Sequence, residues 1–181
     1  PFQVDEERRE EYGPYAVVSG KDPDRAARLV REGWATTMVN EHAPHTREEV
    51  EPGWEDAWNI PLGLMGAQEH VPHVLTWVNE GRFTLEDVVR LEARNPAQIF
   101  GLYPQKGSLQ VGTDADLTLV DMDETRTFTE DDVESKSGWT LFDGVTFEGW
   151  PVRTVVRGET VMADREIRAE PGFGEFVPQK D

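Results

Sequence analysis

The chain has 181 residues and a hydrophobic content of 37%, which suffices for a core but not for an extensive one. Its 36 acidic residues against 18 basic ones give a formal net charge of −18, which repels phosphate backbones and anionic lipids. We therefore expect no nucleic-acid partner and no membrane partner. No apolar run approaches the roughly 20 residues that span a bilayer and no signal-peptide pattern is present, which predicts a cytoplasmic protein. The absence of Cys leaves only His and carboxylate side chains as metal ligands.

The first part of the chain alternates between strand and helix patterns. Residues 15–18 are apolar and predict a short strand. Asp22 followed by Pro23 predicts the start of a helix, and Gly33 predicts its end. The apolar run at residues 34–40 predicts the next strand. This order is typical of an alternating α/β fold.

The middle of the chain predicts a loop and then a series of helices. Residues 47–66 contain many Gly and Pro residues among aromatic ones, which predicts an ordered active-site loop without regular structure. Apolar residues at helical spacing predict a helix over residues 71–78. A Thr-x-x-Asp capping box at residues 84–87 predicts a second helix, and Asn-Pro at residues 95–96 predicts the start of a third.

The pattern changes after Gly107. Short β-like runs divided by Gly and Asp predict a small β module. Arg157 followed by Gly158 predicts a hairpin turn inside it. The acidic residues 129–138 predict an exposed, solvated loop.

The most informative stretch is Asn-Glu-His-Ala-Pro-His-Thr at residues 40–46, where a carboxylate and two imidazoles follow a predicted strand. Side chains at the carboxyl ends of the strands of an α/β barrel converge on one mouth, where the chemistry takes place. The stretch resembles the Asp-His-Ala-Pro-His-Thr motif of the cyclic amidohydrolases, the group of dihydroorotases, hydantoinases and allantoinases. Glu41 stands where that motif has Asp and is the first candidate catalytic residue.

Other segments resemble the same family in the same order. They are Asn-Pro-Ala-x-x-Phe-Gly-Leu at residues 95–102, Gly-x-Asp-Ala-Asp-Leu at residues 112–117, and a relative of Ser-Lys-x-x-Trp-x-Pro-Phe-x-Gly at residues 135–144. The resemblance implies an α/β fold in which residues 1–106 are the last strands and helices of a (β/α)8 amidohydrolase barrel. Residues 107–181 are then a small β-sandwich module and a tail.

The resemblance also assigns roles to residues of the candidate site. Glu41 is expected to bind a metal and to carry a proton from the attacking water to the leaving nitrogen. Its side chain is longer than that of Asp by a methylene, which displaces the carboxylate. Three interpretations are therefore compatible with the sequence: Glu41 is catalytic with altered geometry, Glu41 is a vestigial residue of a non-catalytic homologue, or the end of the predicted strand is misplaced. His45 stands at the position where dihydroorotases use a histidine to bind the carboxylate of the substrate. His42 is expected to make a structural hydrogen bond. Gly63 and Gly66 lie in a loop that resembles one touching the substrate ring, although glycines also serve tight turns.

The metal centre implied by the resemblance holds two divalent ions, for which we expect zinc, with most of the ligands outside this chain. A catalytic zinc needs about three protein ligands, and the sequence has no His-x-His pair. Lys21 and Lys136 lie in segments that do not match the family's bridging lysine. His70 and His73 belong to the first turn of a predicted helix, and we expect them to stay outside the metal centre.

We therefore expect the carboxyl-terminal part of a metal-dependent cyclic amidohydrolase that hydrolyses a small cyclic amide or imide. Its expected protein partner is the missing amino-terminal portion of the barrel, from another chain or an upstream segment, within an oligomer. The alternative is a non-catalytic amidohydrolase homologue that serves as a scaffold or partner subunit. Glu41 in place of Asp, and Met65 in place of a loop proline, favour that alternative.

Overall fold

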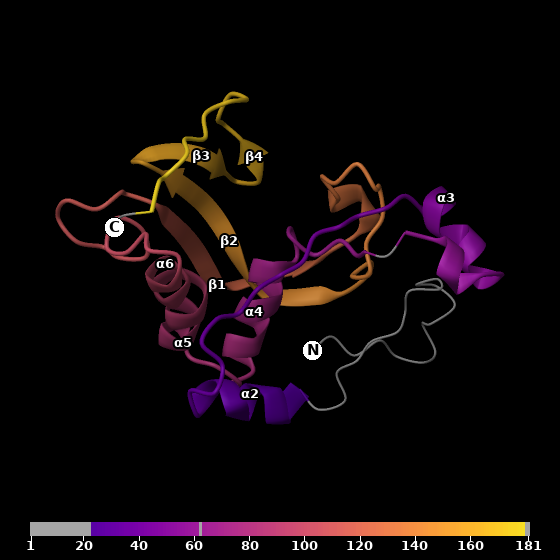
Figure 1. The fold of residues 1–181 in the computed structure, drawn as a ribbon, viewed down its shortest axis with the longest axis horizontal. Helices are drawn as coiled ribbons and strands as arrows, with labels where there is room; N and C mark the ends of the chain where they lie inside the picture. The colour runs from indigo at the N-terminus through magenta and orange to yellow at the C-terminus, as the bar shows by residue number, and fades with distance from the viewer. Residues whose placement is uncertain (1–22, 62, 180–181) are drawn as a thin grey trace.

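The computed structural model describes residues 23–61 and 63–179 (Figure 1). The strand expected at residues 15–18 lies outside this part. The helices are α2 (Pro23–Arg31), α3 (Arg47–Val50), α4 (His70–Asn79), α5 (Leu85–Val89) and α6 (Asn95–Ile99), with a π-helical turn at Arg90–Arg94 and 3-10 turns at Glu51–Trp54, Ala57–Asn59 and Glu130–Asp132. The strands are β1 (Leu117–Thr127), β2 (Thr146–Val156), β3 (Glu159–Ala163) and β4 (Glu166–Ile167). None of the helices within these two ranges is long and apolar enough to cross a membrane.

The strands form one antiparallel sheet in the order β1-β2-β3-β4. The long pair β1 and β2 runs in register from Leu117 opposite Val155 to Thr127 opposite Thr146, with two irregularities between. Arg157 and Gly158 both have positive φ, at 50° and 82°, which is the geometry of a tight hairpin turn between twisted strands. The predicted strands after Gly107 and their hairpin turn are therefore confirmed, although the first strand begins only at Leu117. The pairing of the β module into a sandwich stays a prediction.

Helix α4 packs directly on β2. A Cβ at Gly149 would lie 2.8 Å from Cβ of Leu75, so the helix approaches the strand too closely for any larger residue. The hydroxyl of Thr76 accepts a 2.9 Å hydrogen bond from the backbone N–H of Glu148. The side-chain amide of Asn79 donates to the carbonyl of Met122 on β1 at 2.9 Å. The predicted helix over residues 71–78 is confirmed, and it is fixed to the sheet.

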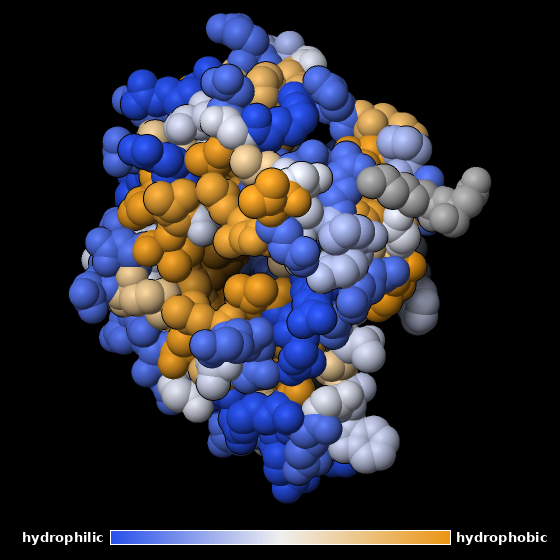
Figure 2. All heavy atoms as spheres, turned by 90° about the vertical axis from the view of Figure 1, so that its left-hand side faces the viewer, coloured by the Kyte–Doolittle hydropathy of each residue, from blue (hydrophilic) through white to orange (hydrophobic). Residues whose placement is uncertain are grey.

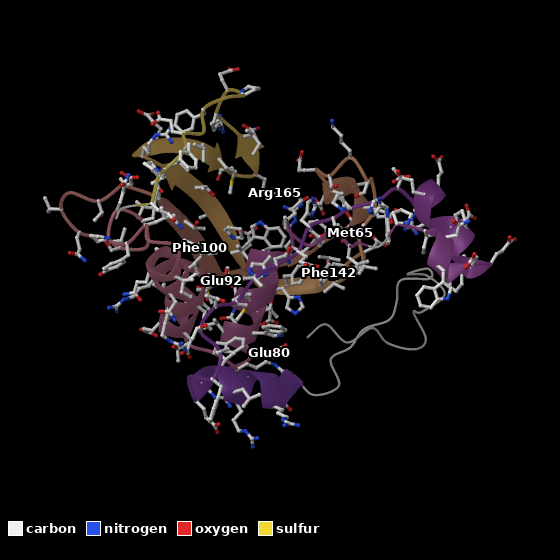
Figure 3. All side chains as sticks on the ribbon, viewed as in Figure 1. Met65, Glu80, Glu92, Phe100, Phe142 and Arg165 are labelled. Carbon is white, nitrogen blue, oxygen red and sulfur yellow. The ribbon has the colours of Figure 1, made fainter. Side chains whose placement is uncertain are left out.

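The main hydrophobic core joins the two parts of the chain. Met65 and Phe142, both labelled in Figure 3, belong to this core. Met65 comes from the predicted active-site loop and is buried in this core. The core consists of Val50, Met65, Phe128, Trp139, Leu141, Phe142, Phe147 and Trp150. The segments on either side of residue 106 therefore stabilise each other.

Helices α5 and α6 form one continuous helical segment through the π-helical turn. Thr84 and Asp87 make the predicted capping box at its start, with the Thr84 hydroxyl accepting from the Asp87 N–H. Helix α6 begins at Asn95 as predicted, but it continues the preceding helical turn, so Asn95 does not cap it. Asn95 instead donates its side-chain amide to the carbonyl of Thr36 at 2.7 Å.

The strand predicted at residues 34–40 is wrong for the described part of the chain, where the segment pairs with no other strand. It runs from α2 past α4 toward α3 (Figure 1). The helical segment fixes it instead, since the carbonyl of Leu91 in the π-helical turn accepts from the N–H of Met38 at 3.2 Å. A strand needs a ladder partner, and here the helix supplies the contacts.

Two loop predictions also need correction. The predicted loop at residues 47–66 is not free of regular structure, because Thr46 and Glu49 form a capping box that starts α3. The acidic run is a solvated loop only in part, because Asp131 is exposed whereas the side chain of Asp132, in the same 3-10 turn, is only 12% exposed. The Asp132 carboxylate contacts Arg126 and, from the turn between β3 and β4, Arg165 at 2.5 Å. Arg165 is labelled in Figure 3. Arg165 is distant in sequence, so the charge run alone could not reveal this contact.

Candidate functional site

Two segments from different parts of the sequence lie side by side and form the candidate site. We call residues 40–46 the histidine segment and residues 63–67 the glycine segment. The N–H of Ala43 donates to the carbonyl of Leu64 at 2.9 Å. The side-chain amide of Asn40 donates to the carbonyl of Gly66, 26 positions later, at 2.9 Å. The two segments are thus held as one unit.

The glycines permit this close approach. A Cβ at Gly63 would lie 2.2 Å from the carbonyl oxygen of Ala43, and one at Gly66 would lie 2.8 Å from Nδ2 of Asn40. The atom met at Gly63 belongs to the backbone, so this position requires Gly for packing, whereas a Cβ at Gly66 would displace the end of the Asn40 side chain. The predicted contact of Gly63 and Gly66 with substrate stays a prediction.

The His42 ring joins the two segments from its Nδ1 atom. It accepts hydrogen bonds from the N–H groups of Gly66 and Ala67, both at 3.3 Å. Because Nδ1 accepts, the ring carries its proton on Nε2 when neutral. The expected structural hydrogen bond of His42 is confirmed.

Glu41 lies between Asn40 and His42, whose side chains both bind the glycine segment. Its own side chain is exposed. Within residues 23–61 and 63–179, no hydrogen bond or ion pair engages its carboxylate. The backbone of Glu41 is therefore fixed on both sides, while its carboxylate remains accessible to a ligand.

His45 is fixed through its backbone and through its ring. Its carbonyl accepts a 2.7 Å hydrogen bond from the indole Nε1 of Trp139. Its ring Nδ1 lies 3.5 Å from Oε2 of Glu49, and its side chain is 27% exposed. Glu49 in turn accepts from the N–H of Thr46 at 2.8 Å. That backbone hydrogen bond is the main reason why the pKa of Glu49 is lowered, so Glu49 is an ionised acceptor at neutral pH.

The other histidines are engaged elsewhere. His70 Nε2 lies 2.9 Å from Oε1 of Glu92 in the π-helical turn. The His73 ring contacts Trp77 edge-on at 4.4 Å and also packs against Phe142. Burial lowers the pKa of His73 to about 4, so this ring is neutral at physiological pH.

The described residues do not make a metal centre by themselves. Their two ranges contain no group of three or more His, Asp or Glu side chains able to hold an ion. A catalytic zinc site needs about three protein ligands, so Glu41 can be at most one of a set completed by other residues.

The acidic motif at residues 112–117 has a structural use. Lys106 Nζ lies 2.9 Å from Oδ2 of Asp114 and also contacts Asp116. Asp116 accepts from the N–H of Arg157 at the hairpin turn at 2.8 Å. The hydrogen bond from Lys106 is the main cause of the lowered pKa of Asp114. These carboxylates tie the end of the helical segment to the sheet and are not free for catalysis.

Sequence reasoning missed Glu49 and Trp139 as partners of His45. Thr46 and Glu49 follow the Ser/Thr-x-x-Glu spacing of a capping box, which could have placed Glu49 beside the histidine segment. Trp139 had no such local signal. Trp54 and Trp58, two aromatic residues of the predicted active-site loop, are 56% and 98% exposed.

Comparisons with known proteins agree with the sequence motifs. The family described as "Amidohydrolase family" matches residues 64–161. An L-hydantoinase of Paenarthrobacter aurescens is 38% identical over 180 residues, covering 95% of this chain and 39% of the relative. A dihydroorotase of Methanothermobacter thermautotrophicus is 39% identical over 138 residues, covering 76% of this chain and 31% of the relative.

Solved structures give the same result. The structure of an L-hydantoinase (dihydropyrimidinase) from Arthrobacter aurescens has a TM-score of 0.88 and 37% identity, covering 97% of this chain and 40% of that one. The chain belongs to the amidohydrolase family. Members of this family are generally metal-dependent. The chain spans only 39% of the length of the L-hydantoinase relative, so it contains part of the family's domain.

Proposed function

We propose that this chain is the carboxyl-terminal part of a metal-dependent cyclic amidohydrolase that opens a ring amide or imide. Its relatives include proteins named L-hydantoinase and dihydroorotase, and this supports the class of substrate. The observation that carries the proposal is the exposed Glu41 carboxylate on a backbone fixed by its neighbours Asn40 and His42. The comparisons give no support to the alternative of a non-catalytic scaffold.

The proposed reaction adds water to the ring carbonyl carbon and breaks the bond from that carbon to the ring nitrogen. Glu41 accepts the proton that the attacking water loses and delivers it to the leaving nitrogen. The product is the open-chain acid, in which the released nitrogen is an amine for a ring amide, an amide for an imide and a ureido group for a ring ureide. An exposed carboxylate on a fixed backbone suits this task, because its oxygen must reach both positions in one geometry.

We also propose that His45 and the backbone at Gly63 and Gly66 bind the substrate near Glu41. His45 keeps a partly exposed ring, and the glycine segment lies against the histidine segment. Two divalent ions, for which zinc remains our proposal, would be held by Glu41 together with ligands from outside this chain.

The described part leaves apolar surface that a further portion of the barrel would cover. Figure 2 shows apolar side chains gathered around a hollow on the side that carries α6. Phe100, labelled on that side in Figure 3, is 59% exposed, and Val111 is fully exposed. Patches of this kind mark interfaces. We propose that the amino-terminal portion of the barrel and an oligomeric partner contact this chain. Residues 1–106 would then complete the barrel, and residues 107–181 would form a β-sandwich. We further propose that the complete enzyme is cytoplasmic.

The test of function uses the assembled protein that carries this chain. Hydantoin, dihydrouracil, dihydroorotate and allantoin are each incubated with it, and the ring-opened acid is measured by chromatography. Release of the acid from at least one ring supports the proposal. No release from any of them, by an assembly that contains bound divalent metal, contradicts it and favours the scaffold alternative.

A further inference from the structure

We infer that Glu49 is a positioning residue that holds the His45 ring by Nδ1 and thereby presents Nε2 to the substrate. The inference rests on the proposed function only for the identity of the substrate. The contact between His45 Nδ1 and Glu49 Oε2 is 3.5 Å long, and the two residues lie one helical turn apart. No hydrogen bond or ion pair engages His45 Nε2 within the residues that the structure describes.

The backbone beneath the ring has little freedom. The buried Trp139 side chain, 2% exposed, donates to the His45 carbonyl at 2.7 Å. The guanidinium of Arg47 lies over the Trp139 ring, 4.9 Å from its centroid. Arg47 also forms an ion pair with Glu130. With the backbone fixed, the orientation of His45 depends on its side-chain torsions.

Glu49 is well suited to fix those torsions because its carboxylate, although its side chain is 55% exposed, is bound to the residue that caps α3. The same oxygen that faces His45 accepts from the N–H and the hydroxyl of Thr46, at 2.8 Å and 3.4 Å. A carboxylate accepts hydrogen bonds only, so a hydrogen bond across this contact places the ring proton on Nδ1. His45 then keeps Nδ1–H toward Glu49 in its neutral and its charged form. The remaining nitrogen, Nε2, is the atom available to a substrate.

This arrangement predicts how variants of Glu49 behave in the assembled protein. Glu49→Ala should lower kcat/KM by roughly 10- to 100-fold, mainly through KM, because a ring without its partner loses its orientation. Glu49→Gln should restore most of the activity, since an amide oxygen still accepts from Nδ1 and Gln also serves in a capping box. His45→Ala combined with Glu49→Ala should be no worse than His45→Ala alone, since Glu49 acts through His45.

Asp87→Ala is the matched control, because Asp87 occupies the same position in the capping box of α5. It should lower the melting temperature about as much as Glu49→Ala and leave KM unchanged. A rise in KM with Asp87→Ala, or an added defect of Glu49→Ala in the His45→Ala background, would overturn the positioning role.

A spectroscopic arm separates this inference from the proposed function. In the wild type, a ring ¹⁵N–¹H spectrum should show a His45 Nδ1–H that is slow to exchange, and Glu49→Ala should remove it. That result supports the positioning role even where no ring substrate turns over. A His45 spectrum unchanged by Glu49→Ala overturns the inference and leaves the proposed function standing.

Discussion

The backbone carbonyl of His45 accepts a hydrogen bond from the indole of Trp139, a residue 94 positions later in the sequence. Through this contact the β module, rather than the neighbouring loop, fixes the end of the histidine segment. The indole is buried in the core beside Met65 and Phe142, so core packing and the position of His45 are physically linked.

Trp139→Phe should therefore destabilise the protein and disturb substrate binding together. The change keeps an aromatic ring but leaves the His45 carbonyl without its donor, which costs about 1–3 kcal/mol. Urea unfolding measures the loss. Trp58→Phe is the control, because Trp58 is 98% exposed, and it should change stability by less than about 0.5 kcal/mol. Equal losses in the free energy of unfolding for Trp139→Phe and Trp58→Phe would show that the hydrogen bond to His45 does not stabilise the protein.

Gly63→Ala should destabilise by about 1–3 kcal/mol, as overpacking of a close contact does. The added Cβ would lie 2.2 Å from the Ala43 oxygen, so the glycine segment must move away from the histidine segment. Gly174→Ala is the matched change, since a Cβ there meets nothing within 4 Å. Thermal melting of both variants checks the prediction. Indistinguishable melting temperatures would mean that the two segments are not held together in solution.

His73 should make stability depend on pH between its ordinary pKa of about 6.5 and its lowered value of about 4. In that interval the unfolded chain binds a proton at His73 and the folded chain does not, so the free energy of unfolding falls as the pH falls. The slope is at most about 1.4 kcal/mol per pH unit. The difference between wild type and His73→Gln in urea unfolding at several pH values isolates this residue. A difference that does not change with pH would show that His73 is not buried in neutral form.

The net charge of −18 should make stability rise with salt. Repulsion among the acidic side chains is screened as the Debye length falls to about 3 Å at 1 M salt. The melting temperature should rise between low and molar KCl. Asp123→Lys combined with Asp131→Lys, at two exposed positions, should flatten the curve. A melting temperature that does not respond to KCl would contradict the prediction.

Local patterns predicted the fold best where the deciding contacts are local. The capping box of Thr84 and Asp87 joins residues one turn apart, so its spacing sufficed to place the start of α5. Asn95 has the composition of a cap, but its amide binds Thr36, and the helix passes through it. The environment of Asp132 could not be foreseen, because Arg165 reaches it from 33 residues later in the chain.

In the candidate site, too, the sequence predicted what depends on local motifs and missed what depends on contacts between distant segments. The motif at residues 40–46 is specific enough to indicate the family from the residues alone, and the family is confirmed. The motif could not show that Gly63 and Gly66 pack against Ala43 and Asn40, since such contacts depend on how two distant segments meet. The roles of Glu41 and His45 in catalysis stay predictions, because the described residues contain no complete set of metal ligands around them.

Proton transfer by Glu41 is the step on which the proposed function depends, and a comparison of three proteins decides it. Turnover of the best ring substrate is measured for the assembled protein with wild-type Glu41, with Glu41→Gln and with Glu48→Gln, a change at an exposed nearby carboxylate. We expect Glu41→Gln to lower kcat by about 10²- to 10⁴-fold with an unchanged melting temperature, and Glu48→Gln to have no effect. Full activity of Glu41→Gln would show that another group carries the proton.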